Sequence, residues 1–505
     1  MLEGLLLVLT PSGLFAVIAG VLLGIMVGAI PGLTATLGIA LLLPVTFLMV
    51  PQEGMIMLSG VYAGAIFGGS ISAILLNTPG TPASIVTAWE GNAMARRGEA
   101  PEALGIAAVA SGVGGLFSAV VMLLATAPLA RLALEFGPAE YVALVLFSLV
   151  TVSVMLSTPL LANAAGCAIG LAIATVGLDP VTGVPRFTFG SFQLVGGLDL
   201  VAMLIGFFCM TQGLILAKEA ILGMRRPAVS FTGASRFGVV ARSLSRRLPT
   251  LLRSSTIGTF LGILPAIGPE TTPLVCHAIE RRFARQGEAF GKGSRQGLTA
   301  AECSMNANVG GSLIPLLALG IPGSGAAAVF VGALILHGLR PGPLLFIEQP
   351  TIMYAFFTGF IFVNIFIILL GLYGARYFAI TLRVPKAILA ALVCFFSIFG
   401  TYAIGNSLFN VWVMFGATAF AFLLALVSVP ILPVVLGVIL GGLLEQNIVI
   451  MTRIVRTPDD LLEHPLALAI FAVTIAMLAV STWRRATRLG TATVAEPRIV
   501  RGDRR

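Results

Sequence analysis

The chain has 505 residues, of which 58% are hydrophobic and only 10% are charged, and its mean hydropathy is +1.03. An ordinary soluble domain carries roughly 25% charged residues, so this composition excludes a water-soluble fold. The formal charge of +9 does not indicate a nucleic-acid partner, because the basic residues lie between hydrophobic segments, as the positive-inside rule requires. The five cysteines are scattered and predict neither a metal site nor a disulfide framework.

Long apolar runs, taken in chain order, predict an all-α, polytopic integral membrane protein. About 20 apolar residues are needed to cross a bilayer as a helix. Runs close to or above that length cover residues 14–30, 104–125, 194–216, 353–373 and 466–480. With the other apolar runs, the sequence predicts about 12 membrane segments, so a lipid bilayer is the expected surrounding.

Two pairs of matching passages indicate that the chain contains an internal repeat. The pattern G-x-x-x-G-x-x-P occurs at residues 24–31 and again at 258–265. Gly-Gly-Ser at 68–70 leads to Asn-Thr-Pro-Gly at 77–80, and Gly-Gly-Ser at 310–312 leads to Gly-Ile-Pro-Gly at 320–323. Both pairs have the same order and are separated by about 240 residues, as expected for a transporter built from two related halves.

The basic residues predict that these two halves are inverted in the membrane. In the first half, Arg96 and Arg97 follow the second motif, and no Lys or Arg precedes the first. In the second half, the basic residues precede the third motif and lie between the third and fourth. The predicted division is a first transmembrane half at 1–216, a basic cytoplasmic linker at 217–253, a second transmembrane half at 254–483 and a basic cytoplasmic tail at 484–505.

Proline and glycine interrupt four of the hydrophobic segments, near residues 30–34, 77–82, 265–269 and 321–325. Each break frees backbone N–H and C=O groups that protein, water or ligand must satisfy in lipid. A helix that restarts after a break directs N–H groups into the gap, which suits a carboxylate, and the preceding C=O groups suit a small cation. Each break is alternatively a simple kink or a loop between two spans. The candidate substrate-binding residues are Pro31, Gly32, Thr34, Asn77, Thr78, Pro79, Gly80, Thr81, Gly268, Thr271, Pro322, Gly323 and Ser324.

Three polar residues near the third and fourth breaks are candidates for binding the coupling ion, which is Na⁺ or H⁺. Glu270 directly follows the third break and is costly in hydrocarbon unless it pairs, binds a cation or takes a proton. Asn306 and Asn308 precede the fourth break, where they serve a site or satisfy backbone groups. Glu302 is a weaker candidate, and Glu90 is expected to mark the cytoplasmic boundary. No other cofactor and no metal site is expected.

The sequence contains no complete phosphate-binding motif of an ATPase. Residues 291–294 resemble the end of a phosphate loop, but position 286 is Gln and Gly293 follows Lys292, so G-x-x-x-x-G-K-[ST] is absent. The sequence therefore predicts no catalytic residues and no ATP hydrolysis. A passive channel and a non-transporting membrane scaffold remain alternatives to a transporter, with an intramembrane hydrolase ranked below them.

Four passages resemble the large membrane subunit of the tripartite tricarboxylate transporter family, and the resemblance extends over roughly residues 20–433. They are 68–80 with Glu90-Gly91, 290–294 through Glu302, 320–323, and His337-Gly-Leu-Arg-Pro-Gly342. The resemblance implies a bacterial inner-membrane permease that works with a small membrane subunit and a periplasmic solute-binding protein. It implies uptake of an organic carboxylate driven by an ion gradient. The positions that match the family's motifs are Pro31, Gly32, Asn77, Pro79, Gly80, Gly268, Asn306, Pro322 and Gly323.

The chain departs from the family pattern mainly at the third break. Ala266 stands where a glycine is usual, and Pro269 and Glu270 stand where small residues are expected. Met305 replaces an asparagine, and Glu90 replaces an aspartate. A carboxylate at Glu270 repels an anionic substrate unless it is protonated or bound to a cation. Proton coupling, or a less highly charged substrate, is therefore a second hypothesis.

Overall fold

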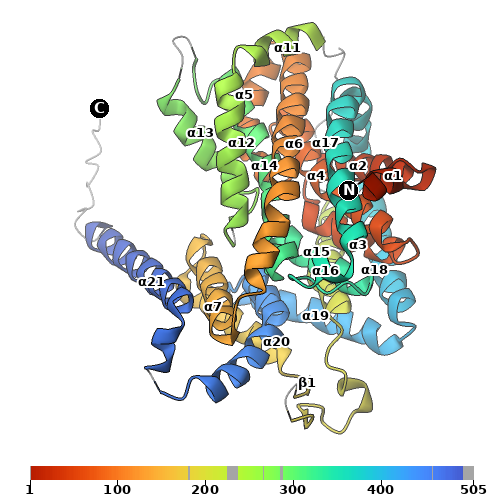
Figure 1. Ribbon diagram of the computed structural model, residues 1–505. Helices are drawn as coiled ribbons and strands as arrows, with labels where there is room; N and C mark the ends of the chain where they lie inside the picture. The colour runs from red at the N-terminus through yellow and green to blue at the C-terminus, as the bar shows by residue number, and fades with distance from the viewer. Residues whose placement is uncertain are drawn as a thin grey trace, which may run out of the picture.

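The computed structural model describes residues 2–179, 182–223, 237–265, 267–284, 288–457 and 459–492, and these are almost entirely helical (Figure 1). Parts of the predicted linker (224–236) and tail (493–505) lie outside the described residues. The main helices are α1 (Leu2–Val8), α2 (Pro11–Ala29), α3 (Ala35–Thr46), α4 (Pro51–Leu76), α5 (Ile85–Arg96), α6 (Ala100–Ala133), α7 (Pro138–Met155), α8 (Leu160–Ala174), α9 (Leu200–Leu204), α10 (Thr211–Ile221), α11 (Phe237–Ser245), α12 (Leu248–Ile263), α13 (Thr272–Arg282), α14 (Arg295–Leu319), α15 (Gly325–Leu336), α16 (Leu345–Glu348), α17 (Pro350–Phe378), α18 (Lys386–Gly405), α19 (Leu408–Leu426), α20 (Ile431–Ile454) and α21 (Pro465–Ala492).

Short elements complete the chain between these helices. A 3-10 helix, η1 (Pro82–Ser84), precedes α5, and a π-helical segment, η3 (Ile205–Met210), joins α9 to α10. Three more 3-10 turns are η2 (Phe192–Leu194), η4 (Ala379–Arg383) and η5 (Asp460–Glu463). Two strands, β1 (Gly177–Leu178) and β2 (Pro185–Arg186), form a small antiparallel hairpin in which Gly177 lies opposite Arg186.

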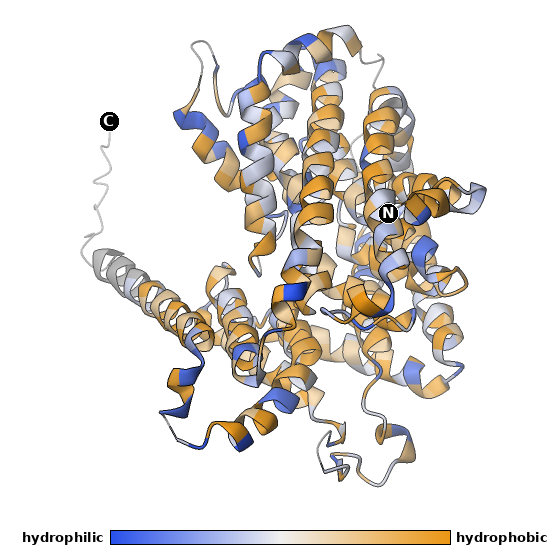
Figure 2. Cartoon of the chain, viewed as in Figure 1, coloured by the Kyte–Doolittle hydropathy of each residue, from blue (hydrophilic) through white to orange (hydrophobic). Residues whose placement is uncertain are grey.

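Within the described residues, ten helices are long and apolar enough to cross a membrane, which confirms a polytopic all-α membrane protein. They are α2, α4, α6, α7, the continuous α9–η3–α10, α17, α18, α19, α20 and α21. Figure 2 shows these helices as largely hydrophobic along their length. The apolar helices α3, α8 and α15 have only 12, 15 and 12 residues. Because a 12-residue helix is about 18 Å long and the hydrocarbon core is about 30 Å thick, they cannot cross alone. Partial spans of this kind account for the difference from the expected 12 segments.

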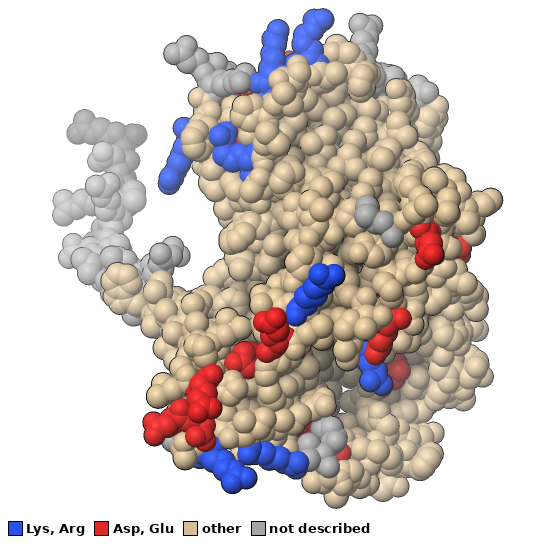
Figure 3. Space-filling model, in the orientation of Figure 1, with Lys and Arg blue, Asp and Glu red and all other residues tan. Residues whose placement is uncertain are grey.

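A cluster of Lys and Arg side chains lies at the end of the molecule near α11 and α13, and Figure 3 also shows acidic and basic side chains over the lower half of the same face. We call the end near α11 and α13 the basic end and define it by Arg97, Arg247, Arg253, Arg282 and Arg295. The β1–β2 hairpin lies at the opposite end (Figure 1). Charged ends separated by an apolar belt are expected of a protein that spans a bilayer.

Glycines allow two pairs of helices to pack backbone against backbone. A Cβ atom at Gly24 of α2 would lie 2.6 Å from the carbonyl oxygen of Val61 in α4. A Cβ atom at Gly262 of α12 would lie 2.6 Å from the carbonyl oxygen of Asn308 in α14. Real Cβ atoms do not approach other atoms this closely, so only glycine fits at these crossings. The glycine motifs read from the sequence therefore build two close helix pairs, one in each half of the chain.

Each pair is extended by a glycine from the break that follows the longer helix. Gly80, after α4, packs directly on the Gly28 carbonyl oxygen of α2. A Cβ at Gly323, after α14, would lie 2.6 Å from the Gly262 carbonyl oxygen of α12. The same three-part arrangement of helix, helix and break thus occurs once in each half of the chain.

The long helices α4 and α14 lie side by side at the centre and run in opposite directions. Tyr62 of α4 contacts Ser312 of α14, with their hydroxyl oxygens 3.3 Å apart. Two turns further along α4, Ser70 lies beside Glu302, which is earlier in α14. Because residue numbers rise along one helix as they fall along the other, α4 and α14 are antiparallel.

Candidate functional site

The first two breaks have different local geometries. After α2 ends, residues 30–34 lead into α3, where the Thr34 hydroxyl accepts a hydrogen bond from the Leu37 N–H at 3.2 Å and caps the helix. After α4 ends, Asn77 adopts a left-handed conformation with φ 55°. The Gly80 N–H then donates to the Gly69 carbonyl at 3.2 Å, which folds the break back onto α4. This main-chain hydrogen bond therefore stabilises the turn by which the chain changes direction between α4 and α5.

The third break is held in place by α14. The Asn308 amide donates to the Ile267 carbonyl and to the Thr272 hydroxyl, both at 2.8 Å. The Thr272 hydroxyl donates in turn to the Gly268 carbonyl at 3.1 Å. Since its amide nitrogen serves the backbone of the break, Asn308 has a clear positioning role at the start of α13.

The fourth break begins at Gly320, which ends α14 with φ 75°, and finishes at Ser324, the N-cap of α15. The buried Ser324 hydroxyl accepts from the Ala327 N–H at 3.1 Å. It also shares a 2.8 Å hydrogen bond with the hydroxyl of Tyr62, a fully buried residue of α4. A tyrosine of the first half therefore contacts the start of α15 in the second half.

The starts of α3, α13 and α15 meet around Ser324. A Cβ at Gly325 would lie 3.7 Å from the Thr36 hydroxyl in the first turn of α3, and one at Gly268 would lie 3.4 Å from the Ser324 Cβ. The second break joins this group less directly, because its helix η1 contacts α13 and α14. The first, third and fourth breaks expected from the sequence thus converge, and the second break lies alongside them.

The predicted site residues differ in accessibility. Thr81, Gly268, Pro322, Gly323 and Ser324 are buried, whereas others are exposed on the described surface, namely Gly32, Asn77, Thr78, Glu270 and Thr271. Glu270 lies two residues before α13, and a Cβ at Gly268 would collide with its carboxyl. No ion pair joins the Glu270 carboxyl to another of the described residues. It is accessible to a cation or a proton at the point where the three helix starts meet.

Asn306 differs from Asn308 although both lie on α14. Its side chain is fully buried, and neither amide atom has a hydrogen-bond partner among the described residues. A buried amide without partners costs free energy, so such groups in native proteins call for a ligand, a water or a functional explanation. Asn306 therefore stays a candidate ligand.

Glu90 makes contacts that the sequence did not predict, because the sequence indicated only that it marks the cytoplasmic boundary. Its buried carboxylate accepts hydrogen bonds from the backbone N–H groups of Gly291, Gly293 and Ser294, at 2.6, 2.9 and 2.8 Å. His277 Nε2 of α13 lies 2.7 Å from the same carboxylate. Burial alone raises the pKa of Glu90, but the hydrogen bonds from His277 and the three N–H groups outweigh it and lower the pKa below 4.5.

Arg97 binds the other side of the same loop. Its guanidinium donates to the carbonyls of Lys292 and Gly293, at 2.6 and 3.0 Å. The segment from Gly291 to Ser294, which leads into α14, is therefore held by α5 and the residue that ends it. The sequence did contain a signal, because Glu90, Arg96 and Arg97 lie close together in a chain with few charged residues. That signal could not show that residues 291–294, about 200 positions later, are their partners.

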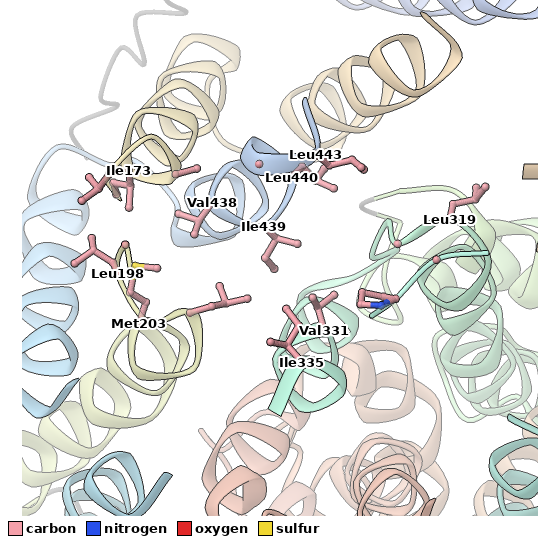
Figure 4. A pocket seen from close by; sticks show the side chains of 18 of the residues that line it. Ile173, Leu198, Met203, Leu319, Val331, Ile335, Val438, Ile439, Leu440 and Leu443 are labelled. Carbon is pink, nitrogen blue, oxygen red and sulfur yellow. The ribbon is translucent and has the colours of Figure 1, made fainter. Parts of the chain in front are cut away.

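A cavity of about 430 Å³ borders the fourth break on the side away from the basic end. Figure 4 shows side chains from α14, α15 and α20 facing it, with Ile173, Leu198 and Met203 opposite. Its lining is mainly aliphatic and includes Gly320 and the Pro341–Pro343 turn. The cavity therefore gives the fourth break an approach from the hairpin end, and its lining residues carry no acidic or basic side chain.

Comparison with known proteins shows which family the chain belongs to. The chain is 34% identical over 480 residues to an uncharacterized 52.8 kDa protein in the TAR-I ttuC' 3' region of Agrobacterium vitis, covering 94% of each chain. It is 30% identical over 191 residues to an uncharacterized protein in the TAR-II ttuC' 3' region of the same organism, covering 38% of this chain and 79% of that one. No solved structure matches the chain. Residues 14–436 match the tripartite tricarboxylate transporter TctA family, and this multi-pass membrane protein therefore belongs to that family of transporter components.

Proposed function

We propose that this chain is the large permease subunit of an ion-gradient-driven, binding-protein-dependent importer of organic carboxylates. It works in the bacterial inner membrane with a small membrane subunit and a periplasmic solute-binding protein, and its C-terminus is cytoplasmic. The observation that carries the proposal is the meeting of three helix starts around Ser324. Membership of the TctA family supports the substrate class and the partners.

Helix starts suit a carboxylate because their N–H groups have no intrahelical acceptor and the helix dipole adds partial positive charge. The Thr34 and Ser324 hydroxyls cap α3 and α15 and add polar atoms at the same place. A carboxylate bound there lies near Glu270, so like charges repel unless a cation or proton is present. Glu270 therefore binds the coupling ion, Na⁺ or H⁺, together with the substrate.

The arrangement of the two halves supports alternating access by an inverted repeat. The central helices α4 and α14 are antiparallel, and each half repeats the same glycine contact between a helix pair and its break. Inverted halves can exchange conformations, so that a site between them opens first to one side and then to the other. The basic end faces the cytoplasm, as the positive-inside rule requires.

Uptake of radiolabelled carboxylates into vesicles that contain the chain and both partners tests the proposal. We expect saturable accumulation of at least one di- or tricarboxylate under an imposed sodium or proton gradient. Unsaturable flux without accumulation would indicate a channel. No uptake by a correctly folded complex would indicate a scaffold.

A further inference from the structure

Glu302 is a fully buried carboxyl in the middle of the helix packing. It lies on α14, and the Thr87 hydroxyl of α5 donates to its Oε1 at 2.5 Å. The Ser111 hydroxyl of α6 donates to its Oε2 at 3.4 Å. Ser70 of α4 lies beside it. Three helices of the first half thus place hydroxyl groups around one carboxyl of the second half.

No Lys, Arg or His in the described part of the chain forms an ion pair with Glu302. An ionised carboxylate buried without a cation costs several kcal/mol, whereas a protonated carboxyl among hydroxyl groups is a hydrogen-bonded neutral group. The surroundings therefore suit the neutral form of Glu302 in this conformation.

One further polar side chain, the Asn306 amide, points to a site rather than to a simple packing contact. Asn306 lies one turn beyond Glu302 on the same face of α14, since residues four apart on a helix are neighbours. The Asn306 amide is fully buried and has no hydrogen-bond partner among the described residues. The unsatisfied amide of Asn306 offers both a donor and an acceptor near the carboxyl of Glu302. The ionised carboxylate can only accept a hydrogen bond from it, whereas the protonated carboxyl can also donate one.

Other titratable groups surround Glu302 unevenly. On α5, Glu90 lies three residues after Thr87, on the same helix face, and its His277 partner reaches the basic end. On the neighbouring position of α14, Cys303 faces the other side, where Cys276 and Glu280 of α13 lie. On the side of Thr87, the nearest titratable groups are therefore the Glu90 carboxylate and its partner His277. On the side of Cys303 they are Cys276 and Glu280, and Glu280 is already paired with Arg253.

The position of Glu302 on α14 connects it with the substrate site. The same helix carries Asn308, which holds the third break, and Ser312, which contacts Tyr62. It ends at Gly320, where the fourth break begins. α14 therefore links the contacts that Glu302 makes with α5 and α6 to both breaks.

We propose that Glu302 is a proton-binding site, separate from Glu270, that couples a proton gradient to carboxylate uptake. This inference rests on the proposed function. The carboxyl oxygen binds the proton in the conformation described here and releases it on the side of Thr87, Glu90 and His277, toward the basic end. The ligand of Glu302 is thus a proton, and no other bond forms or breaks.

Uptake under an imposed pH gradient, with Glu302→Gln, Glu270→Gln and Glu140→Gln compared, tests the proposal. Glutamine keeps the neutral shape of a protonated carboxyl, so Glu302→Gln should exchange substrate across the membrane but lose at least tenfold of its pH-driven accumulation. Glu140 is a matched control, since it is a buried glutamate of α7 that contacts His464 at 3.0 Å, and its variant should accumulate substrate as the wild type does. Glu270→Gln should raise KM for substrate and also reduce gradient-driven accumulation, because the proposed function makes Glu270 a ligand of the coupling ion beside the substrate.

Proton movement in the wild type gives a second readout that does not depend on a variant folding. A pH-sensitive dye inside the vesicles should report proton entry that accompanies substrate uptake. If the wild type accumulates a carboxylate with sodium alone and without proton entry, the proposal for Glu302 is overturned and the transporter function stands. Full pH-driven accumulation by Glu302→Gln would also overturn it. Failure of the wild type to transport any carboxylate would instead overturn the proposed function.

Discussion

At the scale of single residues, the fold depends on glycines that admit no side chain and on one carboxylate that organises a loop. Gly80 packs on the Gly28 carbonyl oxygen, and Gly323 packs on that of Gly262. Glu90 collects three backbone N–H groups and a histidine. Both features join segments that are distant in the sequence, so single substitutions there should affect the whole protein.

Gly80→Ala should strongly destabilise the protein, because its methyl group would collide with a backbone oxygen that cannot rotate away. Overpacking of this kind costs about 1–3 kcal/mol or more. Thermal unfolding of the detergent-solubilised protein should show a clear fall in Tm. Gly416→Ala is the matched control, because this glycine of α19 has open space around it, and alanine should leave Tm equal or slightly higher. Equal Tm values for both variants would contradict the packing described.

Glu90→Gln should destabilise the protein and remove part of its sensitivity to acid. The folded-state pKa of Glu90 lies below 4.5, so its stabilising effect is present above that value and is lost as pH falls through the lowered pKa. Replacement should cost about 1.5–3 kcal/mol at pH 7, as expected for hydrogen bonds to a charged group. Tm measured from pH 7 to pH 3 should fall less steeply in Glu90→Gln than in wild type. Parallel curves would show that Glu90 is not the titrating group.

At the scale of secondary-structure elements, the broken helices determine what the protein can bind. The breaks themselves were predictable, since Pro and Gly are local signals and the interrupted segments are apolar. Their convergence was not, because the Tyr62–Ser324 hydrogen bond joins residues 262 positions apart. For the same reason, Glu270 is a stronger coupling-ion candidate than Glu302 when only the sequence is considered. Adjacency to a break is visible in sequence, but burial among hydroxyls from α4, α5 and α6 is a property of the packing.

Ser324→Ala should reduce carboxylate uptake more than its loss of stability explains. The substitution removes the cap of α15 and one of the two serine partners of Tyr62, at a cost of about 0.5–2 kcal/mol. Thr10→Ala is the matched control, because Thr10 caps α2 with a 3.1 Å bond from the Gly13 N–H, far from the breaks. Tm should fall similarly in the two variants, whereas the KM for uptake should rise at least several-fold only in Ser324→Ala. A similar KM in both variants would remove Ser324 from the binding site.

At the scale of the whole molecule, the two halves form one structure with chemically distinct ends. The basic end carries the charged network of α5, α12, α13 and α14, and the hairpin end carries the cavity beside Gly320. Composition and charge patterning predicted a helical membrane protein with this asymmetry. The glycine contacts that join α2 to α4 and α12 to α14 explain why the matching motifs stand where they do.

Orientation in the membrane is testable with single cysteines placed in a variant that lacks the five native ones. Arg282→Cys lies at the basic end and Thr182→Cys lies in the hairpin loop, and both positions are exposed. A membrane-impermeant thiol reagent added to intact cells should label Thr182→Cys and leave Arg282→Cys unlabelled until the membrane is opened. The reverse pattern would place the basic end outside.

The hydrogen bonds that Glu90 and Arg97 make to residues 291–294 restrict how α14 can move. Glu90 and Arg97 hold this segment by both its N–H and its C=O groups, so α14 is tied to α5 at the basic end. At the other end of α14, the Tyr62 hydroxyl is shared between Ser312 and Ser324, and the cavity lies beyond. Charge-assisted hydrogen bonds are roughly twice as strong as neutral ones. We therefore expect the basic end to act as the hinge of the transport cycle, with the larger displacement at the hairpin end.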